Sequence, residues 1–595
     1  MTILVAAYCT VVVNPVLGQP WDGGGVEGDP YLIYTAEDMQ AIGADPNYWD
    51  AHFLLMEDID LSAYTGTSFN IIGNDDNRFI GVFDGNDHIV RNLYINATGI
   101  KYMGLFGFAI STAEIKDLNL VNFSIHNSGT GSATGALVGY NRGFISNCYA
   151  SGSVTADEST GGLVGYNNSG TILDSSCDAT VEGGGYTGGL LGYNNSGIVT
   201  DSHATGDVTG TGNIGGLLGK SYYGIILNCH ASGSVTQNCP LGCFYAGGLI
   251  GRSYYGTIEN CHASGQVNGS TVFGGLIGAN FGGTVSNSYS SSQVIGNNSD
   301  DLGSFAGVNQ FGTISRCYAT GDALSNGDVV GAFVGLNTNE SVISDCYSSG
   351  DAQGDESVGP MAGTSGSDSS IINCYSSGSA SGNTNIGGFI GEGSSEEGLY
   401  TGCFWHISVN TGLTGIGNIT NPVVGVIGET TSNMQTQSTF TNVGWDFVGE
   451  IVNGTEDIWR MCVDDVNYPM LWWEFLSGDF LCPDGVNFLD YAFLAERWLM
   501  TDYGDVGGVE LTGDGKIDLN DFARFAEYWR VTGCGDCGGA DYTGEGDVDL
   551  GDLEVFTGVW LGSEYGDCEG AELSGDGRVG VEDLGAFAGN WLEGF

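Results

Sequence analysis

The stretch Gly135-Ala136-Leu137-Val138-Gly139, followed by Ile145-Ser146-Asn147-Cys148-Tyr149-Ala150, decides the fold because it recurs along the chain. Its first part returns at Gly162-Leu163-Val164-Gly165, Gly189-Leu190-Leu191-Gly192, Gly216-Leu217-Leu218-Gly219, Gly248-Leu249-Ile250-Gly251 and Gly275-Leu276-Ile277-Gly278. From Leu137 to Phe389 the central residues are 26, 27, 27, 32, 27, 29, 28, 28 and 28 positions apart, and an earlier copy at Leu105 makes eleven units. A fixed period of this length is typical of stacked repeats.

Each unit predicts short strands and no helix. It contains two or three short apolar stretches broken by Gly, Asn and Ser, without a run of helical period. We therefore expect a mainly β protein in which residues 101–405 form a right-handed parallel β-helix, or solenoid. Because neighbouring strands lie ~4.8 Å apart, eleven coils would extend on the order of 50 Å.

The alternation of side chains predicts which residues are buried. Cys148 and Ala150 share a parity that points inward, whereas Tyr149 and Ser151 point outward. The inward column contains only small residues: Cys148, Ser175, Ser202, Cys229, Cys261, Ser288, Cys317, Cys346, Cys374 and Cys403. We favour buried Cys as a small apolar filler that Ser can replace, over a disulfide or metal ladder. Cys239 and Cys243 lie in the one lengthened coil, where a local disulfide and free thiols are equally open.

The next position along the chain holds an outward column of rings. It contains His203, His230, His262, Tyr149, Tyr289, Tyr318, Tyr347, Tyr375 and Phe404. A ladder of aromatic-sized side chains on the surface accounts for the whole column. Three stacked histidines holding a metal ion are the alternative.

Composition and charge limit the function classes. The 595 residues include 103 Gly with 9 Pro and are 41% hydrophobic, which argues against collagen and against disorder. The net charge of −57 excludes nucleic acid as a partner, because phosphate binding requires Lys and Arg. Calcium ions are one complement to this charge, and a solvated acidic surface is the other explanation.

The regions that flank the repeats predict export and caps. Residues 1–18 resemble a signal peptide without its positive n-region, which leaves the true start open, and we expect a secreted, extracellular or cell-surface protein without a membrane span. Residues 19–100 should form an N-terminal cap with irregular coils, including a helix over 36–43 capped by Thr35 and Asp38. Residues 406–478 are aromatic-rich and should form a C-terminal cap, where core packing is favoured over a sugar-binding platform.

Four repeats in residues 479–595 carry the clearest chemical pattern. Asp490, Asp521, Asp552 and Asp583 are each 31 residues apart. In the loop from Glu510 to Asp521, oxygen ligands stand at positions 1, 3, 5, 9 and 12, with Gly515 at the sharp turn, as calcium loops require. The expected ligands are Glu510, Thr512, Asp514, Lys516, Asp518, Asp521, Asp541, Thr543, Glu545, Asp547, Asp549, Asp552, Glu572, Ser574, Asp576, Arg578 and Asp583. Backbone carbonyls would be the ligands at Lys516, Asp547 and Arg578. The first loop is one residue short, and an acidic turn without metal is the alternative reading.

Two resemblances follow from these motifs. The solenoid resembles proteins built from GLUG repeats, in a layout similar to secreted proteins of planctomycete-like bacteria. The calcium repeats resemble dockerins, which implies an α-helical, EF-hand-like region bound to a cohesin-like partner. The pair at loop positions 10 and 11, such as Leu519-Asn520, departs from the familiar Ser-Thr. GLUG repeats imply attachment through the solenoid to a glycan or a cell surface.

Catalysis is the main alternative to binding, because β-helices host polysaccharide lyases and hydrolases. A lyase needs cations near a uronate and a hydrolase needs two positioned carboxylates. The chain has only fourteen Lys and Arg residues, which argues against a lyase. The acids of the repeats show no repeated pairing, which argues against a hydrolase. We expect a secreted, calcium-binding, non-catalytic protein in adhesion or extracellular assembly. The alternative is a dockerin-bearing glycan hydrolase or lyase that contributes to extracellular polysaccharide degradation.

Overall fold

The computed structural model describes residues 21–238, 245–297, 301–396, 398–449 and 452–475. The chain divides into two compact units, one ending at Glu429 and the other beginning at Thr430. The first unit is a right-handed parallel β-solenoid of about 13 turns, as the sequence predicts. The expected signal peptide (1–18), the Cys239–Cys243 pair and the calcium repeats (479–595) lie outside the described residues.

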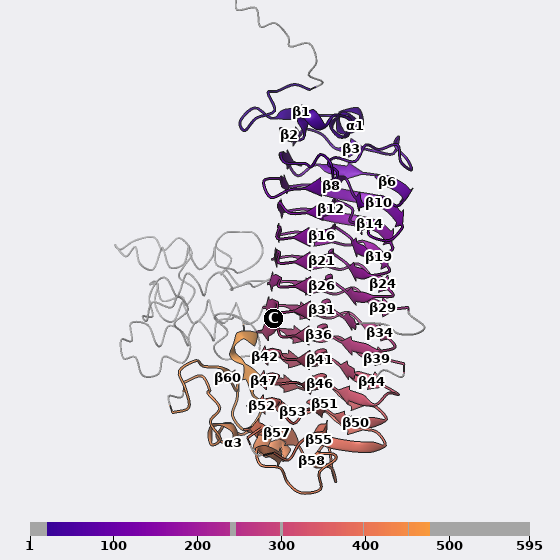
Figure 1. Ribbon diagram of the computed structural model, residues 1–595. Coiled ribbons are helices and arrows are strands. Elements are labelled where there is room, and N and C mark those ends of the chain that lie inside the picture. The colour runs from indigo at the N-terminus through magenta and orange to yellow at the C-terminus, as the bar shows by residue number, and fades with distance from the viewer. Residues whose placement is uncertain (1–20, 239–244, 298–300, 397, 450–451, 476–595) are drawn as a thin grey trace, which may run out of the picture. The chain divides into compact units, whose positions relative to one another are not determined.

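Near its N-terminal end the solenoid carries a helix whose cap was predicted. Helix α1 (Ala36–Ala44) starts at Thr35, which forms a capping box with Asp38. A short 3-10 helix, η1 (Pro46–Tyr48), follows. Met39 and Ile42 on α1 are fully buried, and Trp49 Nε1 donates a hydrogen bond to the Ile42 carbonyl at 2.7 Å. Helix α1 therefore covers the N-terminal end of the stack, as Figure 1 shows.

The first sheet has 22 strands and contributes two strands to most coils. One row, which we call the inner row, comprises β8 (Phe106–Ala109), β12 (Val138–Asn141), β16 (Val164–Asn168), β21 (Leu191–Asn195), β26 (Leu218–Tyr222), β31 (Ile250–Tyr254), β36 (Ile277–Phe281), β41 (Ala306–Gln310), β46 (Val334–Thr338), β51 (Ala362–Ser365), β55 (Thr384–Glu392) and β58 (Thr414–Ile416). The other, the outer row, comprises β7 (Tyr102–Met103), β11 (Ala133–Thr134), β15 (Ser159–Gly161), β20 (Tyr186–Gly188), β25 (Asn213–Gly215), β30 (Tyr245–Gly247), β35 (Val272–Gly274), β40 (Asp301–Gly303), β45 (Val329–Gly331) and β50 (Glu356–Gly359).

The second sheet has 14 short strands, and in the regular coils the middle residue of each strand is buried. They are β1 (Tyr31–Ile33), β2 (His52–Leu55), β4 (Val82–Asp84), β9 (Glu114–Lys116), β13 (Phe144–Ser146), β17 (Thr171–Leu173), β22 (Ile198–Thr200), β27 (Ile225–Leu227), β32 (Thr257–Glu259), β37 (Thr284–Ser286), β42 (Thr313–Ser315), β47 (Val342–Ser344), β52 (Ser370–Ile372) and β56 (Tyr400–Thr401). All neighbours pair in parallel, which defines a stack of coils.

The third sheet closes most coils with two short strands and two of the early coils with one long strand. It comprises β3 (Ile59–Asp60), β5 (Ile89–Arg91), β6 (Tyr94–Thr98), β10 (Asn119–Ser128), β14 (Tyr149–Ala156), β18 (Ser176–Cys177), β19 (Thr180–Gly183), β23 (His203–Ala204), β24 (Val208–Gly210), β28 (His230–Ala231), β29 (Val235–Gln237), β33 (His262–Ala263), β34 (Val267–Gly269), β38 (Tyr289–Ser290), β39 (Val294–Gly296), β43 (Tyr318–Ala319), β44 (Ala323–Ser325), β48 (Tyr347–Ser348), β49 (Ala352–Gln353), β53 (Tyr375–Ser376), β54 (Ala380–Ser381), β57 (Cys403–His406) and β59 (Val426–Glu429).

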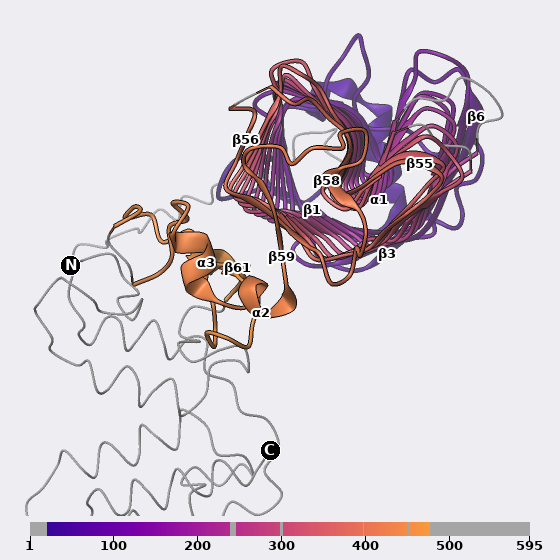
Figure 2. The ribbon, with the colours of Figure 1, turned by 90° about the horizontal axis from the view of Figure 1, so that it is seen from below.

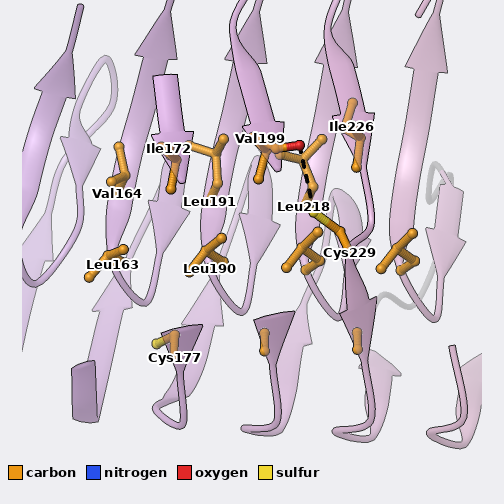
Figure 3. Packing of buried hydrophobic residues seen from close by; sticks show 14 of the residues in the cluster. Leu163, Val164, Ile172, Cys177, Leu190, Leu191, Val199, Leu218, Ile226 and Cys229 are labelled. Atoms are coloured by element: carbon orange, nitrogen blue, oxygen red, sulfur yellow. Dashed lines mark hydrogen bonds between the residues drawn. The ribbon is translucent and has the colours of Figure 1, made fainter. Parts of the chain in front are cut away.

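The coil has two lobes, which Figure 2 shows along the axis. The larger lobe holds a continuous apolar core in which Leu163 and Leu190 occupy equivalent places in successive coils (Figure 3). The smaller lobe has a separate core that includes Val208, Ile214 and Phe273. Between the lobes the chain is pinched, and a Cβ added to Gly189 would lie 2.9 Å from the Cβ of Ala204. The recurring glycines are therefore needed for close packing.

The column of small residues is buried as predicted, and the structure corrects the expected role of its members. Cys229 is 1% exposed, and its thiol donates to the carbonyl of Leu227 at 3.0 Å. Ser202 one coil earlier donates to the carbonyl of Thr200 at 2.8 Å. Cys and Ser are interchangeable here because both supply a small hydrogen-bond donor, not because Cys is merely apolar. The described cysteines of this column are free thiols.

The predicted ladder of rings is also present. His203 and His230 stack with ring centroids 4.6 Å apart and an interplanar angle of 4°, and His262 continues onto Tyr289 at 4.7 Å. The prediction placed the whole ladder on the surface, but Tyr347 and Tyr375 near its C-terminal end are buried. Stacked rings one coil apart thus account for the column.

The C-terminal end of the solenoid and the second unit follow the repeats. Strands β58 and β59 still pair with the preceding coil, so the solenoid unit extends beyond residue 405.

The second unit contains α2 (Thr431–Met434), α3 (Gln437–Thr441), η2 (Trp472–Glu474) and an antiparallel pair, β60 (Trp459–Arg460) and β61 (Met470–Leu471). Trp445 and Trp459 are fully buried with ring centroids 4.4 Å apart, which confirms core packing for these two residues.

Candidate binding surface

The calcium ligands expected from the sequence all lie in residues 510–583, outside the described residues. Within the described ranges, no group of three or more His, Cys, Asp or Glu side chains is arranged to hold a metal ion. The surface with the most distinctive chemistry is instead the outward face of the first sheet.

A strip of aromatic side chains with two cations runs along this outward face. In the inner row the register aligns Tyr140, Tyr166, Tyr193, Lys220 and Arg252 in five successive coils. Outer-row residues Tyr102, Tyr186 and Tyr245, with Tyr222, Tyr223, Tyr254, Tyr255 and Phe281 beside the cations, complete what we call the tyrosine strip. In Figure 1 the inner-row strands that carry the tyrosine strip are those labelled from β12 to β36.

The N-terminal part of the tyrosine strip is hollowed. This hollow of about 260 Å³ is lined by five tyrosines of the two rows, Tyr102, Tyr140, Tyr166, Tyr186 and Tyr193. Its other polar lining residues, which include Lys101 and Glu158, lie in or beside the outer row. A second cavity, of about 370 Å³, lies elsewhere, under the last coil. Tyr140 and Tyr166 stack at 4.8 Å with an interplanar angle of 10°. Ring faces and hydroxyl groups together suit a ligand that is partly apolar and partly hydroxylated.

Lys220 and Arg252 lie in register on neighbouring strands, at the middle of the strip. Arg252 stands over the rings of Tyr245 and Tyr254 at 4.6 and 4.4 Å. Lys220 stands 5.0 Å from the ring of Tyr193. Burial, and then the neighbouring Arg252, hold the pKa of Lys220 below its usual value, although both side chains remain partly exposed.

Two tyrosines project from the coil corner beside each cation. Tyr222 and Tyr223 are 36% and 51% exposed, and Tyr255 is 55% exposed. Tyr223 and Tyr255 have positive φ angles of 51° and 52°, a conformation that is unfavourable for a bulky side chain. Their rings stack at 5.3 Å with an interplanar angle of 18°. Large rings are thus kept in a strained, exposed position where they add little to the core.

The sequence carried a signal for this surface that the repeat analysis passed over. Lys220-Ser221-Tyr222-Tyr223-Gly224 and Arg252-Ser253-Tyr254-Tyr255-Gly256 replace the Tyr-Asn-Asn-Ser-Gly of the two preceding coils, at 166–170 and 193–197. The register shows that these positions are equivalent. A departure from the repeat that adds exposed aromatic residues is the pattern that could have found the site.

Comparison with known proteins agrees with this repeat. The family model of the GLUG motif matches residues 130–155, 183–209, 210–236, 242–268 and 326–353. The solenoid carries GLUG repeats. Two of the matched GLUG segments, 210–236 and 242–268, contain the Tyr-Tyr-Gly corners of the tyrosine strip.

Two curated proteins are similar to part of the chain. The chain is 34% identical over 163 residues to halomucin of Haloquadratum walsbyi and 37% identical over 130 residues to the "Putative Gly-rich membrane protein" of Evansella cellulosilytica. These alignments cover 26% and 21% of this chain but 2% and 15% of the relatives, so the chain spans only a small part of their length. No helix in the described ranges is long and apolar enough to span a bilayer.

Solved structures show a distant likeness. A "putative immunoglobulin A1 protease" from Bacteroides ovatus aligns at 21% identity and a TM-score of 0.31, covering 50% of this chain and 77% of that one. An IgA1 protease aligns at 18% identity and a TM-score of 0.30, covering 48% of this chain and 21% of that one. TM-scores this low do not extend the likeness to activity.

Proposed function

We propose that the chain is a non-catalytic extracellular or cell-surface protein that binds its ligand through the tyrosine strip of the GLUG solenoid. The observation that carries the proposal is the pair of Tyr-Tyr-Gly corners, where Tyr223 and Tyr255 are exposed at positive φ. A strained surface ring gives the fold little stabilisation, so a role in binding accounts for it better than packing does. A role in adhesion or extracellular assembly follows from such a surface on a rigid rod.

The location and the attachment are further parts of this proposal. The relatives named halomucin and Gly-rich membrane protein support a place outside the cell or at its surface. Three of the four acidic repeats of residues 479–595 would bind calcium, and the four together, as a dockerin-like region, would attach the chain to a cohesin-like or other extracellular protein. The likeness to planctomycete-type secreted proteins stays a prediction.

A polysaccharide panel tests binding against catalysis. The full chain, with calcium present, is incubated with insoluble and soluble polysaccharides while retention and the release of reducing or unsaturated ends are both measured. Retention on at least one polysaccharide without new chain ends is the expected result. Turnover that disappears when two facing acids of one coil are replaced would instead make the solenoid an enzyme.

A further inference from the structure

We propose that the tyrosine strip binds an anionic polysaccharide, with sugar rings stacked on the tyrosines of the two Tyr-Tyr-Gly coils and acidic groups held by Lys220 and Arg252. This inference rests on the proposed binding function and adds the chemical class of the ligand. Carboxylate and sulfate groups share the chemistry that these two cations would recognise.

Lys220 and Arg252 lack the anionic partner that three other cations of the solenoid have. Arg91 pairs with Asp60, Lys101 with Asp75, and Lys116 with Asp84. Asp60 and Asp84 lie one coil away from the cations that they pair with. In the described part of the chain, neither Lys220 nor Arg252 forms an ion pair with a carboxylate. Like charges directly opposite each other on neighbouring strands destabilise a sheet. An anion bound between them would remove this repulsion.

Acidic residues are absent from the first-sheet strands of the four coils around Lys220 and Arg252, although they dominate the charge of the chain. The segments 186–200, 213–228, 245–258 and 272–286, which supply the first-sheet strands of four successive coils, contain no Asp or Glu. The whole chain has 71 acidic residues and a net charge of −57. At physiological ionic strength the Debye length is about 8 Å, so the more distant acids are largely screened from a ligand on this face. The local charge around Lys220 and Arg252 is therefore positive, whereas the hollow in the N-terminal part of the strip is lined by both Lys101 and Glu158.

The aromatic groups explain why the expected anion is a polysaccharide. Tyr222 and Tyr223 on one coil and Tyr254 and Tyr255 on the next present rings beside the two cations. Sugar rings stack on aromatic faces through their axial C–H groups, and hydroxyl groups bond to tyrosine O–H. Coils repeat every ~4.8 Å, close to the length of one pyranose unit, so successive sugars of one chain can meet successive coils.

Two double variants separate the two kinds of contact. Lys220→Gln with Arg252→Gln removes the charges, and Tyr223→Ser with Tyr255→Ser installs the residue that Ser169 and Ser196 provide at the same corner of preceding coils. Lys116→Gln, on the second sheet, is the matched control for loss of a cation. Circular dichroism and thermal melts verify that each variant keeps the fold of the parent.

Binding of the full chain is measured by calorimetry and affinity electrophoresis at physiological salt. The ligands are polygalacturonate for carboxylates, dextran sulfate for sulfates, and unmodified dextran as the neutral polymer. The parent should bind at least one acidic polymer and should not bind dextran. Each double variant should bind that acidic polymer at least about tenfold more weakly than the parent does, whereas Lys116→Gln should bind it like the parent.

Each other outcome has a definite meaning. Acidic polymer bound equally by the parent and by Lys220→Gln/Arg252→Gln overturns the inference. Dextran bound as tightly as the acidic polymers also overturns it but leaves the proposed binding function in place. A parent that retains no polysaccharide of any kind overturns both.

Discussion

At the scale of single residues, the thiol of Cys229 illustrates how the interior of the coil is specified. The residue before it, Asn228, has a φ of 52°, which turns the chain so that the Cys229 thiol reaches the carbonyl of Leu227. Asn tolerates this conformation better than most residues, and Ser or Cys supplies the short donor that follows. The Asn-Cys pair is thus a corner motif whose two residues have separate physical roles.

Replacing Cys229 tests this role. Cys229→Ser should change the free energy of unfolding by less than about 1 kcal/mol, because the hydroxyl makes the same hydrogen bond. Cys229→Leu should destabilise by about 1–3 kcal/mol, because the column has room for small side chains only. Urea denaturation followed by circular dichroism measures both. If Ser were as damaging as Leu, a shared donor would not explain the column.

The histidine ladder predicts a dependence of stability on pH. Burial, and then the neighbours His262 and His203, lower the pKa of His230 to about 4. The unfolded chain has the ordinary value near 6.5, so it binds more protons between pH 6.5 and 4, and the stability that neutral His230 contributes is lost as pH falls through this range. His230→Tyr keeps a ring of the kind found at Tyr289 and removes this proton.

The difference between parent and His230→Tyr isolates this effect from the many carboxylates. Between pH 7 and pH 4.5 the free energy of unfolding of the parent should fall relative to that of the variant, by about 1 kcal/mol after allowing for the partial exposure of the ring. Parallel curves for the two proteins would show that His230 does not titrate in this way.

At the scale of elements, the waist between the two lobes fixes the path of each coil. A Cβ on Gly216 would clash with the carbonyl of Gly248 and would lie 2.9 Å from the Cβ of Ala231. The turn between an outer-row and an inner-row strand therefore packs directly on the third sheet. Separate cores on either side of this contact give the coil its two lobes.

Gly216→Ala should therefore be among the most damaging small substitutions. We expect a loss of at least about 2 kcal/mol, because backbone atoms of the next coil would have to move. Thr209→Ala on β24, an outward position of the same coil region, is the control and should stay within about 0.5 kcal/mol. Thermal melts compare the three proteins, and equal melting temperatures would contradict a tightly packed waist.

At the scale of the whole molecule, the acidic C-terminal repeats predict that calcium orders part of the chain. Each intact loop brings several carboxylates together, so their repulsion opposes folding until a cation is bound. Calorimetric titration of the full chain should give about three calcium ions, as the three intact loops predict. Asp514→Ala should remove one of them.

The damaged first loop supplies the control for calcium. Asp484→Ala lies in the loop that is one residue short, and it should leave the number of bound ions unchanged. Circular dichroism with and without a chelator records the accompanying gain of helix. An absence of calcium binding up to millimolar concentration, or no effect of Asp514→Ala, would contradict the calcium hypothesis.

The sequence by itself determined the class of fold and the direction of most repeat side chains. Period and parity suffice for this, because a parallel coil places equivalent residues above one another, and they correctly predicted the buried Cys148 column and the cap at Thr35. The tertiary structure decided what depends on contacts between distant positions. The two-lobed cross-section, the burial of Tyr347 and the donor role of the thiols are of this kind.

The candidate site shows the same division. Residues Tyr222 and Tyr254 are visible in the sequence as a change within the repeat, but their meaning depends on which residues of other strands lie beside them. Only the register brings Lys220 next to Arg252, and only the packing of inner and outer rows places Tyr186 and Tyr245 across from them. Local pattern specifies a coil, whereas a binding surface that extends over several coils is created by their stacking.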